Sequence, residues 1–98
     1  MMTIGELKAA FERHSDEYLE FERIAHPRHP RPDLCAFLML HDLAPGTGDM
    51  VADATHDEVF LSVDPKVVAK KITDDMVRDL CRCGVRFSRE HDSFAMFT

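Results

Sequence analysis

Apolar and polar positions in the first segment of the chain recur at the spacing of a helix. From residue 4 onward, apolar or aromatic residues return in alternating steps of three and four, which places them on one helical face. Thr3 and Glu6 have the T-x-x-E spacing of a capping box, and Pro27 is incompatible with a continued helix. The pattern therefore predicts one long helix over residues 4–25. Its stripe would consist of Ile4, Leu7, Phe11, His14, Tyr18, Phe21 and Ala25.

The following segment, AHPRHPRPDL at residues 25–34, predicts a connector. Its three prolines fix φ and hold the residues before them extended. A zinc site would need further ligands at a typical spacing, and a nucleic-acid finger would need a basic stripe with interleaved aromatic residues. The segment shows neither, so we expect a semi-rigid spacer. Asp33 is then the expected N-cap of a buried helix, LCAFLMLHDL, which ends at Pro45 and Gly46.

The second half of the chain predicts short elements. Residues 47–57 are expected to form a loop with one helical turn around residues 50–54, and EVFLSVD alternates apolar and polar positions as a strand does. Two short helices follow, PKVVAKKI after Asp64 and DDMVRDLCRC after Thr73, the second closed by Gly84. VRFSRE and SFAMFT predict a hairpin. We expect the uncharged SFAMFT at the centre of the sheet and VRFSRE, with its arginines, at an edge.

This order of elements predicts a single α+β domain over residues 1–98. A helical hairpin over residues 3–44, with a long N-terminal helix, would be followed by a strand–helices–hairpin unit over residues 58–98. The helices would pack on a small three-stranded, mostly antiparallel sheet ending in the C-terminal hairpin. No apolar run reaches the roughly 20 residues of a membrane span. The odd number of cysteines argues against a disulfide framework and favours a cytoplasmic location.

Two interpretations of the long apolar stripe stay open at this point. The stripe either packs on the second helix or pairs with a second copy in a homodimer. In paired helices a polar residue at a core position, such as His14, can set the register. The candidate dimer stripe consists of Ile4, Leu7, Phe11, His14 and Tyr18.

Charge is distributed unevenly along a chain whose net charge is −6. From Asp33 to Asp64 the chain holds acidic residues and no lysine or arginine. This region is either an ordinary solvated surface or a negative patch that docks on a basic surface of a protein partner. The candidate partner-binding residues are Asp49, Asp53, Asp57 and Glu58, extended by Asp16, Glu17 and Glu20 of the first helix. On a helical turn, Asp49, Asp53 and Asp57 would stack on one face.

The acidic excess also makes direct binding to nucleic acid improbable. A DNA-binding regulator would have to use the basic last third of the chain, where Lys66, Lys70, Lys71, Arg78, Arg82, Arg86 and Arg89 could form a face.

Enzymatic chemistry has one candidate pattern, three His-Asp pairs at His41-Asp42, His56-Asp57 and His91-Asp92. Neighbouring histidine and aspartate bind divalent ions in metal-dependent phosphohydrolases, although those domains are long and all-helical. A small metal-dependent hydrolase is therefore the alternative function, and it requires at least two pairs to converge on a pocket. Cys81 is expected on the buried side of its helix, where a thiol is inert. With no glycine-rich phosphate loop and no G-x-S-x-G motif, we assign no catalytic residue, metal or cofactor.

Four stretches carry a resemblance: RPDLCAFLMLHDLAPGTGDMV, HDEVFLSVD, DLCRCGVRF and the closing MFT. From Arg31 on, the chain resembles small phage or prophage-encoded proteins of unassigned function. The resemblance implies a cytoplasmic accessory protein made inside a bacterial host, and it assigns no catalytic residue. Our first expectation is thus a non-enzymatic, acidic interaction protein.

Overall fold

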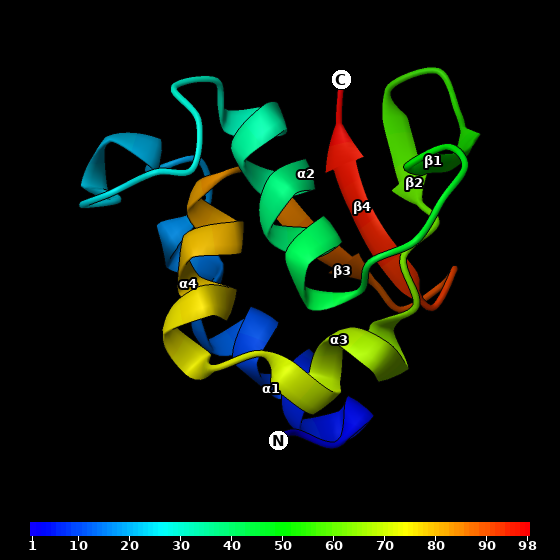
Figure 1. The fold of residues 1–98 in the computed structure, drawn as a ribbon, viewed down its shortest axis with the longest axis horizontal. Coiled ribbons are helices and arrows are strands. Elements are labelled where there is room, and N and C mark those ends of the chain that lie inside the picture. Colours follow the sequence, from blue (N-terminus) through cyan, green and yellow to red (C-terminus); the bar gives the residue numbers. More distant parts are fainter.

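Four helices and a four-stranded sheet make up the computed structural model, which describes residues 1–98 (Figure 1). The α+β class is confirmed, with four strands where three were expected. The helices gather on one side of the sheet in Figure 1. The elements are α1 (Ile4–Arg13), α2 (Pro32–Leu43), β1 (Val51–Ala54), β2 (Glu58–Leu61), α3 (Pro65–Lys71), α4 (Asp74–Arg82), β3 (Val85–Ser88) and β4 (Ser93–Phe97).

The sheet is antiparallel throughout, in the order β1-β2-β4-β3. The uncharged β4 lies between two neighbours and β3 lies at an edge, as expected. The prediction of a helical turn at residues 50–54 is wrong, because Val51–Ala54 form the other edge strand. Asp53 there pairs with Phe60 of β2, and the register shifts between Val51 and Asp53. Pairing with β2 therefore decides the conformation of a segment whose own pattern is ambiguous.

The long N-terminal helix is also corrected. The capping box forms as expected, with the Thr3 hydroxyl accepting from the Glu6 amide and the Glu6 carboxylate accepting from the Thr3 amide. The helix nevertheless ends at Arg13, and the chain turns back over α4 through two single turns of 3-10 helix at Ser15–Glu17 and Phe21–Arg23. Leu19, with φ of +63°, is left-handed and donates its amide to the Cys81 carbonyl at 3.1 Å. Contacts with α4 thus replace the helical hairpin expected over residues 3–44.

Local capping signals account for the shorter helices. Asp64 accepts from the Lys66 amide at the start of α3, and Thr73 accepts from the Met76 amide at the start of α4. Asp33 is not the N-cap of α2: the helix begins at Pro32, two residues earlier than expected, and Asp33 occupies its first turn. Proline suits the first helical position because its missing N–H would lack an intrahelical partner there.

One hydrophobic core joins the helices to the covered face of the sheet. Phe94 of β4 is fully buried, with the rings of Phe11 and Phe87 each 5.7 Å from it. Leu7 and Phe11 of the predicted dimer stripe are buried within this core. Leu7, with no exposure, is therefore not available to a second copy, and most of the apolar face of α1 packs inside the monomer.

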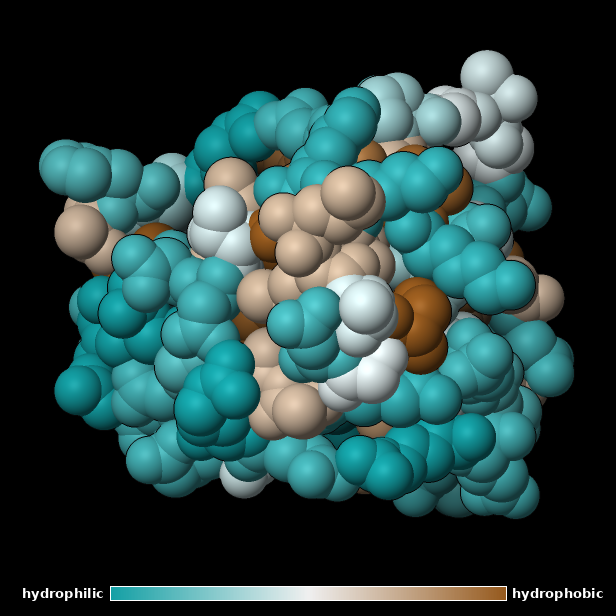
Figure 2. Space-filling model, turned by 90° about the horizontal axis from the view of Figure 1, so that it is seen from below, coloured by the Kyte–Doolittle hydropathy of each residue, from teal (hydrophilic) through white to brown (hydrophobic).

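The remaining members of the stripe are only partly buried. Ile4 and Tyr18 keep intermediate exposure, and His14 points its Nε2 at Asp74 of α4, 2.8 Å away. Figure 2 shows the end of the molecule where the N-terminus lies, and it is mostly hydrophilic with a narrow central apolar strip. None of the helices is long and apolar enough to cross a membrane.

Candidate functional site

Three aspartates lie along the exposed β1 edge of the sheet. Asp53 is in β1, Asp49 precedes the strand and Asp57 lies in the turn to β2, and all three are exposed. None of them takes part in an ion pair anywhere in the structure. We call Asp49, Asp53 and Asp57 the acidic edge. They stand on an extended segment and its turn, not on one face of a helical turn as the spacing suggested.

Hydrogen bonds that involve backbone groups fix the positions of these residues. The Ser62 hydroxyl donates to the Asp49 carbonyl at 2.6 Å, and the amide of the C-terminal Thr98 donates to the Asp57 carbonyl at 2.9 Å. The Asp53 carboxylate accepts from the amide of Ala54 at 2.8 Å. The acidic edge is therefore held by contacts from Ser62, which follows β2, and from Thr98, which follows β4, while its side chains are exposed.

Glu58, the fourth predicted acid, differs from its neighbours. Its carboxylate forms an ion pair with Arg86 of β3, and its side chain is largely buried. The Arg86 guanidinium lies over the ring of Phe97, 4.3 Å from the centroid, in a cation–π contact. Glu58 is therefore neutralised inside the molecule and does not contribute a free charge to the acidic edge.

The three acids predicted to extend the patch lie far from β1. Figure 1 places residues 15–23 beside α4, on the opposite side of the molecule from β1. Glu17 binds Arg82 at 2.6 Å and Arg23 at 2.6 Å, and the Glu17 and Arg82 side chains are only 12% and 10% exposed. The Arg82 guanidinium lowers the pKa of Glu17. Glu17 thus holds its segment on α4 through Arg82 and does not present a free charge.

Asp16 and Glu20 do not form ion pairs of this kind. Asp16 is exposed and has no ion pair, and Glu20 is partly buried. The neighbouring Glu22 carboxylate raises the pKa of Glu20 by sharing a hydrogen bond with it and by repulsion between the two charges. These two residues therefore lie outside the acidic edge.

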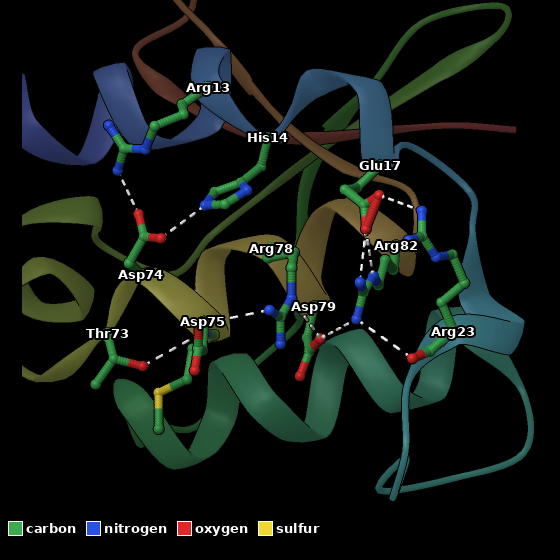
Figure 3. A network of polar contacts seen from close by, with 11 residues as sticks. Arg13, His14, Glu17, Arg23, Thr73, Asp74, Asp75, Arg78, Asp79 and Arg82 are labelled. Atoms are coloured by element: carbon green, nitrogen blue, oxygen red, sulfur yellow. Dashed lines mark hydrogen bonds and ion pairs between the residues drawn. The ribbon is translucent and has the colours of Figure 1, made fainter.

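A polar network fastens the turned-back segment to α4 (Figure 3). Arg13 and His14 both bind Asp74, and Arg13, followed by His14, lowers the pKa of that carboxyl. Arg82 also donates to Asp79 at 3.2 Å and to the Arg23 carbonyl at 3.3 Å. Except for the Arg82–Asp79 bond within α4, these bonds join residues about 60 positions apart in the chain. They hold the segment after Arg13 on α4, so that α1 ends at Arg13.

The arginines of the basic last third are not free cations. All four of its predicted arginines pair with carboxylates: Arg78 with Asp75 and Asp79, Arg82 with Glu17 and Asp79, Arg86 with Glu58, and Arg89 with Glu12. Lys66, Lys70 and Lys71 are exposed on α3. Among the acids of the middle region, only Glu58 receives a cation from this part of the chain.

The three His-Asp pairs stand apart from one another. His41 and Asp42 are near the end of α2, where Asp42 pairs with Arg28. His56 and Asp57 lie in the turn between β1 and β2. His91 and Asp92 lie between β3 and β4, with the centroid of the His91 ring 4.0 Å from that of Phe60. No group of three or more His, Cys, Asp or Glu residues is placed to hold a metal ion. Three hollows of the surface, lined by residues of α1 and β3, of α2 and the connector, and of the segment before β1, each lack at least two of the pairs, so the convergence that a hydrolase requires is not seen there.

The cysteines are free and buried. Burial raises the pKa of Cys81 to about 12, and it also raises the pKa of Cys83. A thiol of this kind holds its proton at neutral pH and is a poor nucleophile. The expected burial of Cys81 is confirmed.

One feature had no signal in the sequence, a groove of about 360 Å³ between α1 and β3. The aromatic side chains that line it are those of Phe11, Tyr18, Phe87 and Phe97. Because these residues come from distant parts of the chain, no local spacing in the sequence predicts the groove. No protein-family model, curated protein or solved structure matches this chain. Any function must therefore be argued from these surfaces themselves.

Proposed function

We propose that this protein is a non-enzymatic interaction protein that docks on a basic surface of another protein through the acidic edge. The observation that carries the proposal is the lack of any cation partner for Asp49, Asp53 and Asp57, although Glu17 and Glu58 are both paired. A phage-type accessory role in the cytoplasm of a bacterial host belongs to the same proposal. The resemblance over residues 31–98 supports it.

The shape of β1 favours such docking. Ala52 and Ala54, which alternate with Val51 and Asp53 along the strand, have small side chains and are exposed, so a partner surface can approach the strand closely. Three like charges on one edge create a local negative potential that speeds encounter with a basic surface. Binding of this kind weakens as salt screens the charges.

The test compares two variants with equal net charge. The first, D49N/D53N/D57N, removes the charges of the acidic edge. The second, D16N/D33N/E90Q, removes three exposed charges elsewhere. Exposed substitutions of this kind change stability by only about 0.5 kcal/mol, so both variants should melt as the wild type does.

Wild-type protein on beads is used to capture proteins from a bacterial lysate at low and at high salt, and the captured protein is then purified. Titration of that purified protein should show binding that the first variant loses and the second retains. The wild-type affinity should fall with rising salt. Equal affinity of the wild type and D49N/D53N/D57N would refute docking through the acidic edge.

A further inference from the structure

The groove between α1 and β3 has the size and lining of a binding site. Its volume, about 360 Å³, lies in the range of roughly 300–1,000 Å³ that ligand pockets occupy. Aromatic rings of Phe11, Tyr18, Phe87 and Phe97 line it together with Val85. Phe97, at the end of β4, is 54% exposed. A large ring left this exposed at a groove is a surface that a partner can cover.

The groove runs beside a sheet edge whose backbone is free. β3 pairs with β4 alone. No backbone hydrogen bond outside the helices and strands involves residues 85–88, and no side chain bonds to their backbone. An edge strand presents unpaired N–H and C=O groups at alternate residues, and an extended peptide can pair with them as an added strand.

The two edges of the sheet differ in this respect. At β1, the carboxylate of Asp53 accepts from the amide of Ala54 and so occupies a backbone donor. At β3 no side chain does this, and the aromatic groove lies alongside. A strand added at β3 would therefore meet free backbone groups together with an aromatic groove, a combination that β1 does not offer.

The lining of the groove holds more cations than anions, although the net charge of the chain is −6. Lys8, Arg86 and Arg89 line it with a single anion, Glu12, and the charge of Arg86 is met by Glu58. Arg89 is 63% exposed and its partner Glu12 is 65% exposed. Lys8 pairs with the exposed Asp92 at 3.3 Å and lies over the ring of Phe87, 5.4 Å from the centroid. Exposed ion pairs of this kind contribute little to stability, so these cations can exchange their partners for carboxylates of a ligand.

We propose that this groove binds an extended acidic peptide segment of another protein, which adds to β3 as a fifth strand. Successive side chains of a strand point to opposite faces. Apolar side chains at alternate positions of the peptide would enter the aromatic groove, and acidic side chains between them would meet Lys8 and Arg89. This surface is distinct from the acidic edge, which lies at the other end of the sheet.

The probe is a fluorescent heptapeptide in which glutamate alternates with phenylalanine or valine. Two comparison peptides replace every glutamate by lysine, or methylate the backbone nitrogens on one edge so that the peptide cannot pair as a strand. Fluorescence anisotropy measures affinity, and amide chemical shifts locate the bound peptide. We expect saturable binding of the glutamate peptide, binding at least about tenfold weaker for both comparison peptides, and the largest shifts at residues 85–88.

Four variants locate the site. Phe97→Ala and Arg89→Gln, both at exposed side chains, should weaken binding about tenfold each. Arg31→Gln, an exposed arginine of the connector, removes the same charge and should leave the affinity unchanged. D49N/D53N/D57N should also bind normally, which separates this proposal from the acidic edge.

Three outcomes would overturn the proposal. They are no saturable binding of the glutamate peptide up to about 1 mM, equal affinity for the lysine peptide, or an affinity insensitive to both Phe97→Ala and Arg89→Gln.

Discussion

Replacing Gly84 by alanine tests how the segment after α1 is held on α4. Gly84 follows α4 with φ of +94°, a conformation that L residues rarely adopt, and its amide donates to the Cys81 carbonyl at 3.0 Å. A Cβ at this position would lie 2.9 Å from Cδ2 of Leu19. The Leu19 amide donates to the same Cys81 carbonyl. Gly84→Ala therefore combines backbone strain with a clash against the turned-back segment.

The structure allows the two contributions to be separated. The left-handed backbone costs an L residue about 1–2 kcal/mol. The clash adds on the order of 1 kcal/mol at most, because Leu19 is 60% exposed and the end of its side chain can move. We therefore expect Gly84→Ala to lower the free energy of unfolding by about 2 kcal/mol. For a domain of this size the melting temperature would fall by roughly 8–16 °C.

Two other glycines serve as matched controls. Gly48 has φ of +90° but nothing within 4 Å of its added Cβ, so Gly48→Ala should show only the strain, about 1–2 kcal/mol. Gly46 has neither feature, and Gly46→Ala should be neutral or stabilise by up to about 1 kcal/mol. In a Leu19→Ala background, the destabilisation caused by Gly84→Ala should be smaller by the contribution of the clash alone.

Urea denaturation followed by circular dichroism gives each free energy of unfolding. The reasoning is refuted if Gly46→Ala destabilises as much as Gly84→Ala, because φ would then not decide the outcome. A Gly84→Ala cost that is the same with and without Leu19 would show that the segment does not contact this position.

Three further predictions concern the core, acid stability and the thiols. Leu7→Ala, at a side chain with no exposure, should lower the free energy of unfolding by about 2–5 kcal/mol; light scattering should show a monomer before and after the change, and a wild-type dimer would contradict the packing of this stripe. Because Arg82 lowers the pKa of Glu17 below its usual 4.5, the pair stabilises the fold above that pH and is lost as pH falls through the folded-state pKa. Melting temperatures of wild type and Arg82→Met should therefore converge as pH falls below 4.5, and a constant gap would refute the linkage. With the pKa of Cys81 at about 12, a thiol reagent at neutral pH should react with the cysteines only after denaturation, and a fast reaction of the folded protein would contradict their burial.

Local signals predicted much of the fold. Capping at Thr3, Asp64 and Thr73, the glycine that closes α4, and the C-terminal hairpin all appear where expected. Each depends on hydrogen bonds or backbone preferences within a few residues, so the sequence around it contains the necessary information. The central place of β4 followed from its lack of charge.

The two wrong elements share a different cause. Helical periodicity continues past Arg13 in the sequence. In the structure, however, the Glu17 carboxylate binds Arg82, 65 residues away, and the Leu19 amide donates to the Cys81 carbonyl. Val51–Ala54 lacks a strong pattern and becomes a strand because β2 offers an edge to pair with. After Arg13, partners more than 60 residues away override the local helical preference. At β1 the partner strand β2 is only a few residues further along, but the pairing, and not the pattern of residues 51–54 themselves, decides the strand.

The sequence by itself determined how much negative charge the molecule carries and that its middle region supplies no basic residue. Only the tertiary structure decided which carboxylates stay free, since that depends on which distant arginines reach them. Arg82 and Arg86 neutralise Glu17 and Glu58, and no cation reaches the acidic edge. The groove beside β3 was decided in the same way, because its rings come from three elements and a turn that meet only after folding.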